Sequence, residues 1–115
     1  MYQFSYAEIL EDAPEIGRQR ELAAFDRALD LLRIADRPDA ASKDRQAAAS
    51  FLQNLWAVLI DDLCNPENAL PETLRGDLIS VGLWSMRQSG EILSTPDCSL
   101  AALIEVNTSV RDGLR

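Results

Sequence analysis

The sequence contains no histidine, only two cysteines and a single lysine, and these absences remove several classes of function. Without histidine the chain cannot build a Ser-His-Asp triad, a Cys-His pair or an imidazole-ligated metal site. Cys64 and Cys98 are too few for a tetrathiolate site, and we expect reduced thiols in or near the core. A Gly-rich phosphate loop and an activated nucleophile are also missing. The sequence therefore predicts a protein that is not an enzyme and holds no metal or cofactor.

Long hydrophobic runs and basic clusters are missing as well. The longest apolar run is six residues, 55–60, whereas a helix needs ~20 to span a bilayer. The N-terminus lacks the basic start and apolar stretch of a signal peptide. Eleven basic residues face nineteen acidic ones, for a net charge of −8, whereas binding to a phosphate backbone needs a basic patch. We therefore expect a cytoplasmic protein without membrane insertion or direct nucleic-acid binding.

The residues that are abundant favour helices. Among 115 residues there are 17 Leu and 15 Ala but only four Val, and Leu and Ala lose little entropy in a helix. Three segments contain proline, at residues 37–39, 65–67 and 95–97. We expect helices to be interrupted there, because proline disfavours helix in the residue before it. The sequence predicts an all-α fold, a compact bundle of about four helices with short Pro-containing connections.

The expected organisation is one domain over residues 1–115. An N-terminal arm at 1–12 precedes helices at 14–36, 42–64, 71–94 and 98–112. Pro14 suits a first helical turn. Ser42 is expected to cap the start of the second helix, and Asn65 is expected to end it in a left-handed conformation.

The two central helices carry broad apolar faces, wider than four amphipathic helices obviously need. This surplus favours an exposed apolar patch or an oligomer interface, and the oligomeric state stays open. Gly82 lies in the most apolar stretch and predicts close approach of another helix. Gly90 is expected to weaken that helix or end it early.

The aromatic residues supply the candidate partner-binding positions. Trp56 and Trp84, one on each central helix, are expected in the core, with the alternative that one lines a groove for a partner helix. The strict alternation of Tyr2, Phe4 and Tyr6 indicates an extended arm that either folds onto the bundle or docks onto a partner. The complete candidate set is Tyr2, Phe4, Tyr6, Leu55, Trp56, Leu59, Leu83 and Trp84.

The densest acidic cluster is Asp61, Asp62 and Glu67. Carboxylates could hold a divalent cation or perform acid–base chemistry. Adjacent residues point about 100° apart on a helix, however, so the two aspartates do not converge. We expect a solvated surface rather than a site.

Several segments of the chain form a familiar set: residues 1–6, 24–28 and 110–114, and a longer block at 55–63, 66–71, 74–75 and 78–84. These segments are similar to the flagellar biosynthesis regulator FlaF family of alphaproteobacteria. The resemblance covers essentially the whole chain and is weakest at 37–50.

The resemblance implies a cytoplasmic protein that promotes flagellin synthesis or secretion, as a flagellin-binding chaperone or adaptor. It also implies a place beside FlbT, a regulator that restrains flagellin synthesis. The alternative is a regulator that acts through a FlbT-like partner or on flagellin mRNA translation without binding flagellin. The family offers no catalytic residues to carry over.

Overall fold

Four α-helices make up the part of the chain that the computed structural model describes, residues 14–95 and 98–113. They are α2 (Pro14–Ala35), α3 (Ser42–Leu63), α4 (Glu72–Ser94) and α5 (Ala101–Gly113). These residues contain no β-strand. The predicted all-α bundle is therefore confirmed. The expected arm at 1–12 lies outside the described residues.

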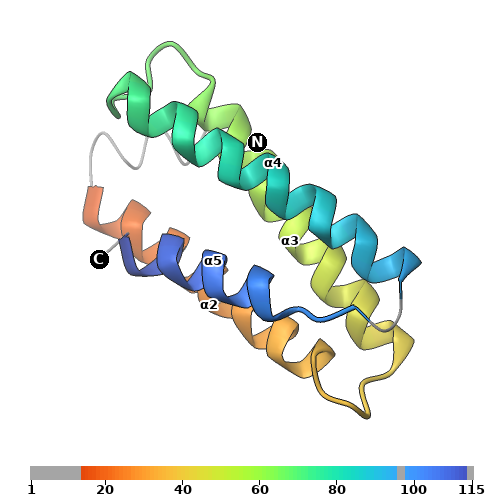
Figure 1. The fold of residues 1–115 in the computed structure, drawn as a ribbon. Helices are drawn as coiled ribbons and strands as arrows, with labels where there is room; N and C mark the ends of the chain where they lie inside the picture. Colours follow the sequence, from red (N-terminus) through yellow and green to blue (C-terminus); the bar gives the residue numbers. More distant parts are fainter. Residues whose placement is uncertain (1–13, 96–97, 114–115) are drawn as a thin grey trace.

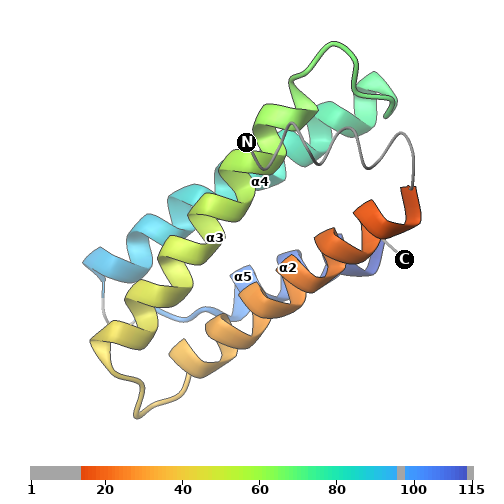
Figure 2. The ribbon, with the colours of Figure 1, turned by 180° about the vertical axis from the view of Figure 1, so that it is seen from behind.

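The helices run up and down in sequence order and form two pairs (Figure 1). Helix α4 lies along α3, and α5 lies along α2, whereas α4 and α5 contact each other only briefly. Helices α2 and α3 are closest at the loop that joins them and separate toward the other end (Figures 1 and 2). That other end holds the start of α2, the end of α3, the start of α4 and the end of α5.

The start of α3 differs from the expected N-cap. Ala41 is the capping residue, and Ser42 is the first residue of the helix. Alanine has no side-chain acceptor for the free N–H groups of a first turn. Instead, the Ala41 N–H donates to Asp44 Oδ2 at 3.0 Å. The Asp44 carboxylate also places negative charge near the positive end of the helix dipole.

The end of α3 also differs from the expectation. Cys64 is the capping residue and keeps right-handed helical angles (φ −81°, ψ −9°). Asn65 is not left-handed, because no non-glycine residue in the described ranges has a positive φ. Its Oδ1 instead accepts the Glu67 N–H at 2.9 Å. Asn68 Nδ2 donates back to the Asp62 carbonyl at 3.2 Å, so asparagine side chains close the loop that leads to α4.

Helix α4 continues through Gly90 to Ser94, so this glycine does not end the helix early. Helix α5 begins three residues later than the expected position 98, at Ala101. The Leu100 N–H donates to Asp36 Oδ1 at 3.1 Å. This bond ties the connection to the end of α2, so the helix begins only after it.

The core gathers apolar side chains from all four helices. Helix α2 presents a stripe with 3–4 spacing, and α3, α4 and the start of α5 close over it. The buried cluster consists of Phe25, Ala28, Leu29, Leu32, Ala35, Ala48, Ala49, Leu52, Trp56, Ile92, Leu100 and Leu103. None of the described helices is long and apolar enough to cross a membrane.

Gly82 lets α4 approach α3 at the Trp56 indole, as the sequence predicts. A Cβ built on Gly82 would overlap Trp56 Cε3, and it would lie 2.9 Å from Trp56 Cζ3 and 3.0 Å from Ile60 Cδ1. Real Cβ atoms essentially never lie within 3.0 Å of another heavy atom, as this one would of two Trp56 ring atoms. The absence of a side chain at this position therefore sets the distance between the two helices.

Replacing this glycine should destabilise the bundle. We expect Gly82→Ala to lower the free energy of unfolding by about 1–3 kcal/mol, the usual cost of overpacking a filled core. Gly76→Ala is the matched control on the same helix, because a Cβ there meets nothing within 4 Å. That change should raise stability by up to ~1 kcal/mol through helix propensity. Urea titrations followed by circular dichroism would measure both, and equal effects would contradict the packing argument.

Candidate functional site

Trp56, one of the candidate partner-binding residues, lies inside the bundle. Its side chain is 1% exposed, and its ring meets the Phe25 ring edge-to-face, with centroids 5.7 Å apart and planes at 78°. The indole Nε1–H donates to Asn107 Oδ1 at 2.8 Å. Trp56 therefore contacts α2 and α5 from α3, and it presents no face to a partner.

Asn107 extends this contact into a buried polar network that the sequence analysis missed. Its Nδ2 donates to the Leu103 carbonyl at 2.9 Å and to Ser85 Oγ at 3.3 Å. Ser89 Oγ donates to the Ser85 carbonyl at 2.7 Å. The amide of Asn107 has a partner on both its oxygen and its nitrogen, which satisfies a buried polar group. A signal was present, since Asn107 stands at a core position of the stripe that Leu100 and Leu103 begin.

The other described candidates are distributed over several surfaces. Leu55 and Leu59 are half-buried, and both pack against the core. Trp84 is also half-buried against the core. Leu83 is 46% exposed. Tyr2, Phe4 and Tyr6 lie outside the described residues. The structure therefore does not gather the described candidates into one pocket.

The exposed leucines lie on α4 or in the loop before it. Besides Leu83, they are Leu70 (40% exposed), Leu74 (43%) and Leu93 (51%). These three leucines could not be singled out from the sequence, because the apolar pattern of α4 covers most of its circumference. Only the fold shows that α3 covers one side of α4 while α5 touches it briefly. The apolar surplus predicted for the central helices is thus located along α4.

Arg45 has a structural role at the end of the bundle where α3 begins and α4 ends. The Arg45 guanidinium donates through Nη2 to the carbonyls of Ile92 and Thr95, at 3.1 and 3.2 Å. It also lies 3.7 Å from Cys98 Sγ. These bonds satisfy carbonyls that the end of α4 leaves free. Arg45 lines an open depression there, but its guanidinium is already committed to the backbone.

The acidic residues Asp61, Asp62 and Glu67 differ in exposure and are not gathered as potential metal ligands. Asp61 and Glu67 are exposed and Asp62 is half-buried, and the described residues contain no group of three potential ligands for a metal ion. Burial raises the pKa of the Asp62 carboxyl above its ordinary 3.8. The hydrogen bond from Asn68 Nδ2, 3.2 Å from Oδ2, opposes this rise, while the nearby Asp61 charge adds to it.

Comparison with known proteins decides the family. The sequence matches the family model of the flagellar protein FlaF over residues 2–114. The chain belongs to the FlaF family. No curated protein and no solved structure matches it. The family match spans nearly the whole chain, including both the buried network and the exposed leucines of α4, so this FlaF protein is a flagellar protein.

Breaking the buried network should destabilise the protein. Asn107→Ala removes the acceptor of the Trp56 N–H and one partner of Ser85. We expect the free energy of unfolding to fall by about 2–3 kcal/mol, since buried polar groups without hydrogen-bond partners destabilise the folded state. Ser109→Ala is the control, because Ser109 is exposed and bonds only the carbonyl one turn before it. Denaturant unfolding would measure both, and a loss for Asn107→Ala no larger than for the control would refute the network's role.

The raised pKa of Asp62 predicts a pH-dependent effect. A carboxyl whose pKa is raised by folding stabilises the fold below pH 3.8, and this contribution is lost as the pH rises through the raised pKa. Asp62→Asn removes the half-buried charge and keeps an oxygen for Asn68. At pH 7 we expect a higher melting temperature than that of the parent protein, with the gap closing toward pH 3.8.

The control for this comparison is Asp39→Asn, an exposed loop position. Thermal melts of the parent and both variants from pH 7 to pH 3.5 would measure the effect. A gap for Asp62→Asn that does not vary with pH would contradict the assignment.

Proposed function

We propose that this FlaF protein is a cytoplasmic regulator of flagellum biogenesis that promotes flagellin synthesis or secretion by binding flagellin as a chaperone or adaptor. The observation that carries the proposal is the set of exposed leucines along α4, in a chain of the FlaF family. Exposed apolar side chains grouped on one element are typical of a surface that binds another protein.

The chemistry of flagellin matches such a surface. The terminal segments of flagellin form amphipathic helices that find their neighbours only in the assembled filament. In the cytosol their apolar faces are exposed, and a partner helix can cover them by packing its own apolar face against them. The net charge of −8 of this chain keeps such a complex soluble through mutual repulsion.

Export also sets the strength of binding. A chaperone must hold flagellin in the cytosol and release it at the export apparatus. We therefore expect micromolar to sub-micromolar binding, about −8 to −10 kcal/mol. A few half-exposed leucines provide limited apolar area, which supports an interaction of moderate strength.

Calorimetric titration tests the proposal directly. Purified flagellin, and truncations lacking either terminal helix, would be titrated into the FlaF protein. We expect heat of binding with intact flagellin and its loss when the terminal helix that docks is removed. No heat and no co-elution with any flagellin form would refute flagellin binding.

Co-purification separates this function from the alternative. The FlaF protein would be isolated from cells with and without flagellin genes. Retention of a FlbT-like partner in the absence of flagellin, with no flagellin bound in its presence, would support a regulator that acts through that partner. Binding to flagellin mRNA by the purified protein alone would show as a salt-sensitive gel shift.

A further inference from the structure

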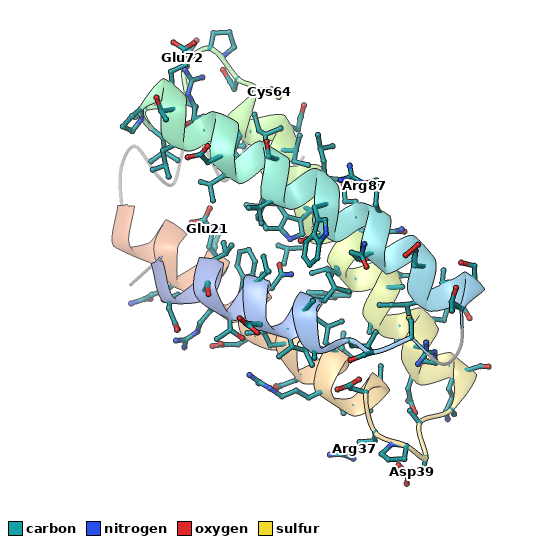
Figure 3. All side chains as sticks on the ribbon, viewed as in Figure 1. Glu21, Arg37, Asp39, Cys64, Glu72 and Arg87 are labelled. Carbon is teal, nitrogen blue, oxygen red and sulfur yellow. The ribbon has the colours of Figure 1, made fainter. Side chains whose placement is uncertain are left out.

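The first nine residues of α4, from Glu72 to Ser80, extend beyond the core, and we call them the α4 projection. Val81 is the first side chain of α4 that packs against the buried cluster. On α2, the first described side chain of the buried cluster is Phe25, and Glu21, one turn earlier, points from α2 toward α4 (Figure 3). Among the described side chains, the α4 projection contributes none to the buried cluster or to the apolar residues packed against it.

Two leucines form the apolar part of the projection. Leu74 is 43% exposed and Leu78 is half-buried, and neither belongs to the apolar side chains packed against the core. Residues four apart lie on the same face of a helix, one turn from each other. The projection is about 14 Å long, at 1.5 Å per residue. This length offers two anchoring positions to a partner helix.

Arg75 gives the projection a positive charge, and the Nε atom of its guanidinium group lacks a hydrogen-bond acceptor among the described residues. This Nε atom is buried. Arg75 lies three positions before Leu78, on the adjoining side of the helix. The residue as a whole is half-buried, so a side-chain rotation can turn the guanidinium edge outward. Arginine always stays protonated, and its edge matches the two oxygens of a carboxylate.

We infer that the α4 projection is where the flagellin helix docks, an inference that rests on the proposed function. The helix places its apolar stripe on Leu74 and Leu78, and an acidic side chain beside that stripe pairs with the Arg75 guanidinium. The carboxylate supplies the acceptor that Arg75 Nε lacks among the described residues. This pairing fixes the register of the docked helix.

Variants with controls outside the exposed leucines test the inference. Ala57 is an exposed apolar residue on α3, and Arg87 is an exposed arginine farther along α4 (Figure 3). The test variants are Leu74→Ser and Arg75→Gln, and the controls are Ala57→Ser and Arg87→Gln.

Calorimetry with intact flagellin is the measurement. We expect the dissociation constant to rise about tenfold or more for each test variant, as for anchors of an interface, and to stay within about threefold for the controls. Circular dichroism melts would show that all four variants fold. Arg75→Lys should bind between the parent and Arg75→Gln, because lysine keeps the charge but not the two-donor edge.

The outcomes separate the inference from the function that it rests on. Flagellin binding by the parent with unchanged affinity in both test variants overturns the α4 projection and leaves the proposed function standing. No binding by the parent overturns both. Self-association of the parent that Leu74→Ser abolishes, without an effect on flagellin binding, assigns the projection to a second copy of this chain and overturns the inference.

Discussion

The Trp56 indole is the contact on which the arrangement of the bundle depends. From the middle of α3 it meets Phe25 of α2 edge-to-face, lies against α4 where Gly82 has no side chain, and donates its N–H to Asn107 of α5. One side chain thus sets the position of three other helices. Helix α5 is the shortest of the four and contacts α4 only briefly, so the hydrogen bonds of Asn107 fix its register where apolar contact is sparse.

This central contact also divides the molecule into two parts. On one side, α2, α3, α4 and the start of α5 enclose a filled apolar core. On the other, the first turns of α2 and α4 extend past the last core residues, and the two pairs of helices separate (Figure 2). The apolar surplus of the sequence lies in and beside α4, outside the enclosed core. The exposed leucines can therefore contact a partner without opening the bundle.

The sequence predicts the helices well because their boundaries depend on local chemistry. Helices α2, α3 and α4 each end within three residues before a proline, and apolar spacing identifies their inner faces. Gly82 was also predictable, since a glycine inside an apolar helix often marks the close approach of another helix. The residues that cap the ends of α3 are harder to predict from the sequence. Whether Ser42, Ala41 or Asp44 closes the start of α3 depends on small differences in backbone angles, and Asn65 acts through its side chain where a left-handed backbone was expected.

The candidate site could be predicted only in part, because exposure is a property of the fold. Trp56 and Trp84 look alike in the sequence. Trp56 is buried and donates a hydrogen bond to Asn107 of α5, whereas Trp84 is only half-buried. Leu74 and Leu83 look alike too, although they lie on opposite sides of α4. Asn107 appears polar in the sequence and is buried because three neighbours satisfy it. Each of these outcomes depends on a helix that is distant in sequence. The apolar periodicity of one helix does not show which other helix packs against it.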